Sequence, residues 1–209
     1  VLTFVSAPDY ETKSTYTATV TASDGTSSDS QDITINITNV NESQTITSSA
    51  TFSAAENQTA IGTVTATDAD GDSLGFSISG SEIDIGVFTG ELTFASAPDY
   101  ETKSSYSATV TVTDGSLSTT QDITVSVINV NDNSPVFTSS ATFSAAENQT
   151  AIGTVTATDA DGNAIAYSIS GSEITIDSST GVLTFTSAPD YETKSTYTAT
   201  VTATDGTNS

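Results

Sequence analysis

The stretch TSSATFSAAENQTAIGTVTATDADG at residues 47–71 recurs without a change at residues 138–162, which is 91 positions later. A second segment, SAPDYETKS, begins at Ser6, Ser96 and Ser187, so its copies lie 90 and 91 positions apart. The chain is therefore built from a repeat of about 90 residues. A repeat of this length is too long for a solenoid unit and is typical of a small autonomous domain.

The phase of the repeat divides the chain into three predicted domains. Residues 1–43 match only the C-terminal half of a repeat, so we expect them to be a truncated copy. Residues 44–134 form one complete copy, and residues 135–209 form a copy that lacks its last strand, the counterpart of residues 121–130. We expect a fragment of a longer array, in which only the middle copy folds independently.

Apolar and polar residues alternate in short runs within each copy, which is the pattern of half-buried strands. Tyr106, Ala108, Val110 and Val112 form one such run, and Asp-Gly and Ser-Gly turn signals separate it from its neighbours. No stretch has the helical period. About seven short strands in roughly 90 residues predict an all-β fold of tandem Ig-like β-sandwiches.

The charge of the chain excludes several functions. Only 3 residues are Lys or Arg against 26 Asp and Glu, which gives a formal net charge of -23. A chain this acidic is a poor partner for nucleic acid or anionic membranes, and no apolar run is long enough to insert into a membrane. Because the chain has no Cys and no His, it has no thiol nucleophile and no imidazole base. Oxygen ligands remain, and these favour hard cations such as Ca²⁺ or Mg²⁺.

Most of the acidic residues belong to five short motifs that recur at strand ends. These are Ala-Glu-Asn (Glu56, Glu147), Asp-Ala-Asp-Gly (Asp68, Asp70, Asp159, Asp161), Asp-Tyr-Glu (Asp9, Glu11, Asp99, Glu101, Asp190, Glu192), Thr/Ser-Asp-Gly (Asp24, Asp114, Asp205) and the boundary segment 129–133. Two carboxylates two positions apart on an extended strand point the same way, so each pair could hold one ion. Like charges packed this closely favour a bound cation over a merely solvated surface.

Two other interpretations of the acids fail. An EF-hand loop beginning at Asp68 would need Gly at Ser73 and Glu at Ser79. Paired carboxylates could be the acid and base of a glycosidase, but catalytic pairs seldom recur identically along an array, whereas structural joints must. We therefore expect no enzymatic activity.

Together these motifs resemble those of cadherin repeats. Glu-Asn stands near the first strand, Asp-x-Asp follows the second, Asp-x-Glu comes later, and Asn-x-Asn-Asp-Asn-x-Pro closes the repeat at residues 129–135. Their order and the period match the family over essentially the whole chain. The resemblance implies seven-strand Greek-key β-sandwiches of cadherin type, placed end to end, with three Ca²⁺ ions at each junction between repeats.

The resemblance also implies which residues hold the ions at the second junction. Asn129 departs from the family, in which Asp is usual at this position. The implied ligands are Glu56, Asp99 and Glu101 from the middle copy, Asn131 and Asp132 by side chain and Val130 and Asn133 by backbone carbonyl from the linker, and Asp159, Asp161 and Asp205 from the last copy.

The other two junctions are expected to be less complete. The first would use Asp9, Glu11, Asn41, Glu42, Asp68, Asp70 and Asp114. It should bind more weakly, because Glu42 and Ser43 replace the family's Asp and Asn. A third junction would take Glu147, Asp190 and Glu192 together with a partner that lies beyond the chain.

We predict a non-enzymatic, calcium-stiffened extender or adhesion module of a large extracellular surface protein. Its partners would be the neighbouring repeats of the same chain and another cell-surface protein or polysaccharide. The near-identical copies, rich in Thr and Ser and free of Cys, favour a bacterial-type surface adhesin. Two alternatives remain open, which are carbohydrate-binding modules and spacers of a secreted multidomain enzyme.

Overall fold

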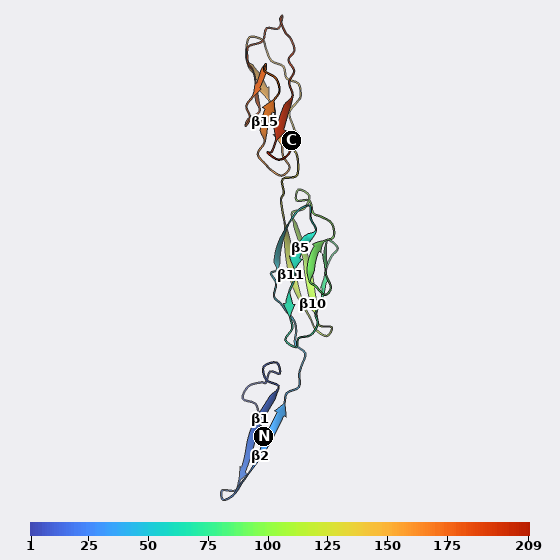
Figure 1. Cartoon of the computed structure of the whole chain (residues 1–209), viewed down its shortest axis with the longest axis vertical. Helices are drawn as coiled ribbons and strands as arrows, with labels where there is room; N and C mark the ends of the chain where they lie inside the picture. Colours follow the sequence, from blue (N-terminus) through green and yellow to red (C-terminus); the bar gives the residue numbers. More distant parts are fainter. The chain divides into compact units, whose positions relative to one another are not determined.

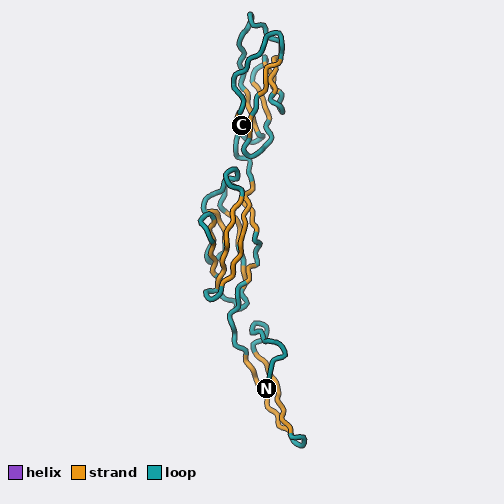
Figure 2. Tube along the Cα trace, turned by 180° about the vertical axis from the view of Figure 1, so that it is seen from behind, coloured by secondary structure: helices purple, strands orange, loops and turns teal.

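The structure of the protein is a computed structural model that describes all 209 residues. It contains 18 strands and no helix, as the strand and loop colouring of Figure 2 shows. No helix is therefore available that could cross a membrane. The chain divides into two compact units, Val1–Pro98 with Ser105–Ser126, and Asp99–Ser104 with Val127–Ser209, which are described separately.

The first unit begins with an isolated hairpin. Strands β1 (Thr15–Ser23) and β2 (Ser28–Asn36) pair antiparallel, from Thr15 opposite Asn36 to Ser23 opposite Ser28. Almost every side chain of the hairpin is exposed, because no second sheet covers it. Residues 1–43 thus have strands but no core of their own.

The middle repeat is a β-sandwich (Figure 1). One sheet has the order β4-β11-β10-β7, another has the order β5-β9-β8, and β3 pairs with β6. The strands are β3 (Thr45–Ile46), β4 (Thr51–Ala55), β5 (Ala60–Thr63), β6 (Ala66–Thr67), β7 (Gly75–Ile78), β8 (Ile83–Ile85), β9 (Glu91–Phe94), β10 (Ser105–Thr113) and β11 (Ser118–Ile128). The neighbours β4 and β11 are far apart in sequence, as the Greek-key prediction requires.

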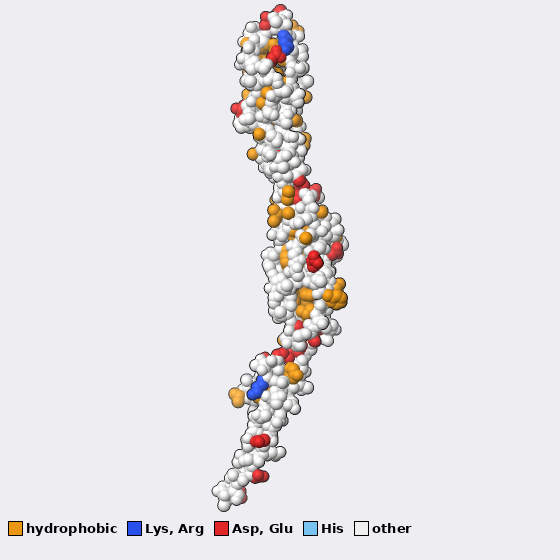
Figure 3. All heavy atoms as spheres, viewed as in Figure 1, with side chains coloured by type: hydrophobic (Ala, Val, Ile, Leu, Met, Phe, Trp, Pro, Cys, Tyr) orange, Lys and Arg blue, Asp and Glu red, His pale blue; other side chains and the backbone are white.

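The core of this repeat consists of the inward residues of both sheets. Leu92, Val110 and Val125 are fully buried, and Ile83 and Ile123 are nearly so. Burial alternates along β10 and β11 with the period expected from the sequence. Threonine and serine occupy most of the outward positions of β10 and β11, and charged and hydrophobic side chains form only scattered groups on the face in Figure 3.

The middle repeat has nine strand segments where about seven were predicted. The first two expected strands are each interrupted, so β3 is separated from β4 and β5 from β6. At the second interruption, the N–H of Val64 donates to the carbonyl of Gly90 over 2.8 Å, so the chain here pairs with a turn rather than with a strand.

The last repeat has fewer strands than the middle repeat, although the two sequences are similar. Its strands are β12 (Val136–Phe137), β13 (Ala151–Thr154), β14 (Ala157–Thr158), β15 (Ala166–Ile169), β16 (Ile174–Ile176), β17 (Val182–Phe185) and β18 (Val201–Thr204). They form the sheets β13-β17-β16, β15-β18 and β12-β14. Residues 142–146 are identical to β4 but form no strand, because the 209 residues include no counterpart of β11 for them to pair with.

Gly90 occupies a place where only glycine fits. Its φ is +68°, and an added Cβ would overlap the carbonyl oxygen of Val64. We expect Gly90→Ala to lower the free energy of unfolding by more than about 2 kcal/mol, because the left-handed strain alone costs roughly 1–2 kcal/mol. Gly80→Ala is the matched control: its φ is +87° but a Cβ there meets nothing within 4 Å. Urea unfolding of both variants checks this, and equal losses would contradict it.

Candidate metal sites

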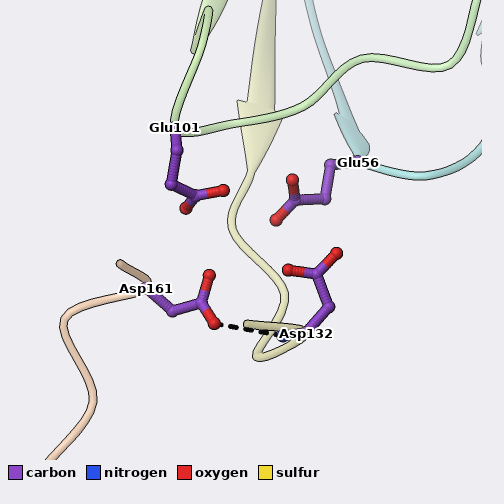
Figure 4. A group of neighbouring side chains, drawn as sticks. All are labelled: Glu56, Glu101, Asp132 and Asp161. Carbon is purple, nitrogen blue, oxygen red and sulfur yellow. Dashed lines mark hydrogen bonds between the residues drawn. The ribbon is translucent and has the colours of Figure 1, made fainter. Parts of the chain in front are cut away.

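The second unit brings three of the predicted ligands together. Ligand oxygens of Glu101, Asp132 and Asp161 lie within 4.8 Å of one another. They come from the turn before β10, from the linker after β11 and from the turn after β14. Figure 4 shows the three carboxylates turned toward one another. Glu56, also drawn there, belongs to the first unit, at the end of β4, and is 4% exposed.

The side-chain amide of Asn133 lies among these three carboxylates. Its Nδ2 donates over 2.9 Å to Asp161 Oδ1, over 2.9 Å to Asp132 Oδ1 and over 3.4 Å to Glu101 Oε2. The backbone N–H groups of Asp132 and Asn133 also donate to Asp161 Oδ2, over 3.1 and 2.9 Å. These bonds, led by the Asn133 side chain, hold the pKa of Asp161 below its ordinary value. These N–H donors therefore offset part of the repulsion between the three carboxylates, and they favour the ionised form of Asp161.

A second group of oxygens in the same unit surrounds the amide of Asn208. Its Nδ2 lies 3.0 Å from Asn131 Oδ1, 3.0 Å from Asp205 Oδ2 and 3.3 Å from the carbonyl oxygen of Asn133. Three of the predicted ligands therefore converge on one point, each through the oxygen that the resemblance implies. Reduced hydration alone would raise the pKa of Asp205, but the N–H groups of Asn208 and Thr207 lower it.

The first unit holds a related cluster, in which ligand oxygens of Glu11, Glu42 and Asp70 lie within 4.8 Å of one another. The backbone N–H of Glu42 and the side-chain amide of Asn39 each donate to Asp70 over 2.8 Å. These two bonds lower the pKa of Asp70. Because Ser43 stands where the other linker has Asn133, this cluster lacks the amide that contacts all three acids in the second unit.

Comparison with known proteins identifies the domain type. The Cadherin domain family model matches residues 140–209. Residues 140–209 belong to the cadherin domain family. Similarity to cadherins extends beyond this span, because one relative matches 73% of the chain in sequence and one solved structure covers 96% of it in fold.

The chain is similar to several animal cadherins. It is 38% identical to mouse Protocadherin Fat 4 over 168 residues, which are 73% of this chain and 3% of the relative. It is 40% identical to human Protocadherin Fat 1 over 146 residues, which are 61% of this chain and 3% of the relative. The chain thus spans only about 3% of the length of these relatives. They are animal proteins, so the bacterial setting stays a prediction.

Solved cadherin structures confirm the predicted fold. The crystal structure of mouse Cadherin-23 EC22-24 has a TM-score of 0.71 at 26% identity, covering 96% of this chain and 72% of that one. The Protocadherin gammaB7 EC3-6 structure has a TM-score of 0.72 at 25% identity, covering 88% of this chain and 53% of that one. The all-β Greek-key sandwich expected from the sequence is therefore correct.

Two aspartates of the cadherin-like repeats have an oxygen that is buried and without a hydrogen bond. These atoms are Oδ2 of Asp68 and Oδ2 of Asp159. In both residues the other oxygen accepts a backbone N–H, from Asp70 over 3.0 Å and from Asn163 over 3.2 Å. Asp68 also forms a group with Asp70 and Asp72. A buried carboxylate oxygen is costly without a partner, and the donor set consists of oxygen alone, so these residues fit Ca²⁺.

The other predicted ligands are placed as follows. Glu147, Asp190 and Glu192 lie together in the second unit, where the N–H of Tyr191 donates to Glu147 over 3.0 Å. Asp114 accepts from the side chain of Asn41 over 2.8 Å, which lowers its pKa. Asp9 and Asp99 each accept the N–H and hydroxyl of a threonine three residues on, so both carboxylates close a turn and neither belongs to the clusters of three or more acids.

Sequence reasoning missed Asn39 and Asn208, and it assigned Asn133 only a backbone role. Asn39 has no signal beyond its place at the start of the linker. Asn208 follows a Thr/Ser-Asp-Gly motif, and the same position in the middle repeat is Leu117. Motifs rich in carboxylate identify the ligands, but they do not identify the amides that hold those ligands.

As the pH falls, the cluster around Asp70 in the first unit should lose bound Ca²⁺ before the cluster around Asp161 in the second unit does. Reduced hydration, followed by repulsion from neighbouring acids, raises the pKa of both Glu11 and Glu42 above the ordinary 4.5. Protons therefore compete with Ca²⁺ at these residues from a higher pH, whereas Asp161 with its lowered pKa stays ionised. Calcium titrations of Asp161→Asn and Asp70→Asn variants at about pH 7 and about pH 5 check this. A larger acid-induced loss in the Asp70→Asn variant would contradict it.

Proposed function

We propose that the chain is a calcium-stiffened module of a large extracellular surface protein that serves in adhesion or as an extender. The observation that supports the proposal is that the three clustered acids of the second unit come from different parts of the repeat array. By the phase of the repeat, Glu101 belongs to the middle copy, Asp132 to the linker and Asp161 to the last copy. A single ion held by these three residues would join two repeats and the segment between them.

Specific residues would hold the ions. Glu101, Asp132 and Asp161 would form one set, with Glu56 and Asp99 added from the middle copy as the cadherin resemblance implies. Asn131, the carbonyl of Asn133 and Asp205 would form another, with Asp159 added from the last copy as the cadherin resemblance implies. In the first unit Glu11, Glu42 and Asp70 would hold an ion together with Asp68. Bound Ca²⁺ supplies the positive charge that so many neighbouring carboxylates require.

The protein's own contribution is to fix the linker. Backbone N–H groups of Asp132 and Asn133 donate to Asp161, which directs the Asp161 carboxylate toward the linker. The clustered acids repel one another when their charge is not balanced, which favours a flexible joint. Sites built from oxygen ligands at domain borders bind in the micromolar to millimolar range, which suits extracellular calcium.

Small-angle scattering of the 209-residue chain tests the proposal. With millimolar Ca²⁺ the radius of gyration and the maximum dimension should become larger and better defined than in chelator. Mg²⁺ at the same concentration is the control for ionic strength, and it should have a smaller effect because it demands a tighter octahedral shell. Identical scattering in Ca²⁺ and in chelator would contradict stiffening.

The other expectations stay predictions. These are a bacterial surface adhesin as the parent protein, a spacer role in a secreted enzyme, and binding of carbohydrate by the repeats themselves.

A further inference from the structure

The carboxylate of Asp114, in the turn between β10 and β11, is surrounded by N–H donors from its own unit. Its Oδ1 accepts the backbone N–H groups of Ser116 and Leu117 over 2.5 and 2.7 Å. Its Oδ2 accepts the side-chain amides of Asn41 and Gln44 over 2.8 and 2.5 Å. A carboxylate has about four lone-pair positions on its two oxygens, so these donors use its full capacity for hydrogen bonds.

Gln44 is the most buried of these donors, with 3% of its surface exposed. It stands directly before β3, and its carbonyl oxygen accepts the hydroxyl of Thr119 in β11 over 2.8 Å. Its side-chain Oε1 is buried without a hydrogen-bond donor. An unpaired buried oxygen is costly, and the charge-assisted bond from Nε2 to Asp114 offsets that cost. Gln44 therefore ties the start of the middle repeat to both sides of the β10–β11 turn.

The equivalent site in the second unit has the opposite composition. Asp205 is the counterpart of Asp114, 91 positions later. There a single amide nitrogen, Nδ2 of Asn208, lies within 3.4 Å of four oxygens, which are Asp205 Oδ2, both side-chain and backbone oxygens of Asn131, and the carbonyl oxygen of Asn133. At Asp114, by contrast, two amide nitrogens converge on one oxygen. Ca²⁺ takes about six to eight oxygen ligands, so only the arrangement in the second unit suits an ion.

Gln44 is the sequence difference between the two sites. Asn41 and Asn131 occupy the same place in the two Asn-Val-Asn segments, 90 positions apart. Gln44 instead corresponds to Pro135, at the offset of 91 that applies from residue 47 onward. Proline has no side-chain donor. Of the two amides that contact Asp114, only that of Gln44 therefore has no equivalent in the second unit.

We propose that the amide of Gln44 braces Asp114 in place of a calcium ion, so that the linker is tied to the β10–β11 turn whether or not calcium is present. N–H groups then offset the charge of Asp114, and this carboxylate is not a calcium ligand. None of the bonds involves the cluster of Glu11, Glu42 and Asp70, so the inference goes beyond the proposed function and does not depend on it.

Counting bound Ca²⁺ by titration calorimetry separates a brace from an ion ligand. The Asp114→Asn variant of the 209-residue chain should bind as many ions as the parent chain, each with an affinity within about threefold. Asp205→Asn is the matched variant, and it should lose an ion or bind it at least about tenfold more weakly. Loss of an ion in Asp114→Asn would overturn the proposal. A parent chain that binds no Ca²⁺ would contradict the proposed function, while the brace would still be decided by hydrogen exchange in chelator.

Hydrogen exchange of the N–H groups of Ser116 and Leu117, measured by mass spectrometry, tests the brace itself, because both groups bond Asp114. In the parent chain their exchange rates should differ by less than about threefold between chelator and millimolar Ca²⁺. Gln44→Met keeps the length of the side chain but removes the donor, and it should raise the rates at least about tenfold in both conditions. Gln58→Met, at an exposed position, is the control and should leave them unchanged. Rates in Gln44→Met that equal those of the parent chain, or that rise only in Ca²⁺, would overturn the proposal.

Discussion

Asp161→Asn should weaken calcium binding to the second unit about a hundredfold, which corresponds to about 2.8 kcal/mol. Asp161 accepts hydrogen bonds from both Asp132 and Asn133 of the linker, and its oxygens lie within 4.8 Å of those of Glu101. The substitution keeps the size of the side chain but removes one negative charge and one ligand oxygen. Titration calorimetry with Ca²⁺ at neutral pH measures the loss.

Asp84→Asn is the control for this result. Asp84 is exposed in the middle of β8 and lies outside every acidic cluster. It removes the same charge, so it should change the calcium affinity less than about threefold through long-range electrostatics, which salt screens. If Asp84→Asn weakens binding as much as Asp161→Asn, the residues assigned to the site are wrong.

Leu92→Ala should lower the free energy of unfolding of the middle repeat by about 3 kcal/mol. Leu92 is fully buried in β9, and removing a buried leucine side chain loses its transfer free energy and leaves a cavity. Urea unfolding in chelator, followed by circular dichroism, measures the effect without the contribution of metal.

Leu2→Ala provides a matched comparison. Leu2, Leu92 and Leu183 occupy the same repeat position, but Leu2 is 67% exposed because residues 1–43 have no opposing sheet. We expect its replacement to change stability by less than about 0.5 kcal/mol. A similar loss in both variants would show that the N-terminal hairpin shares the core of the middle repeat.

The strands were predictable because burial follows the alternation of the sequence. Tyr106, Ala108, Val110 and Val112 alternate with polar residues, and this run lies in β10, where Val110 and Val112 are fully buried. The behaviour of residues 142–146 was not predictable from their own sequence. The identical segment forms β4 in the middle repeat, so the difference arises from the partner strand, which is non-local.

The candidate sites were predictable only as sets of ligands. The recurrence of Asp-x-Asp and Asp-x-Glu identified Glu101 and Asp161, and the linker motif identified Asp132. Sequence spacing suggested that Asp99 pairs with Glu101, and in the structure Asp99 also accepts two hydrogen bonds from Thr102 and lies outside the cluster that contains Glu101. Such competition between a ligand role and a local turn depends on side-chain geometry, which a one-dimensional motif does not specify.

Thermal unfolding of the 209-residue chain, in chelator and in millimolar Ca²⁺, tests the central claim most directly. An ion present at a hundred times its dissociation constant stabilises the folded state by about 2.7 kcal/mol. Each kcal/mol shifts the midpoint of a domain as long as one repeat, about 90 residues, by about 4–8 °C. We predict a rise of at least about 10 °C with Ca²⁺, reduced in the Asp161→Asn variant. The same midpoint in chelator and in Ca²⁺ would contradict the account.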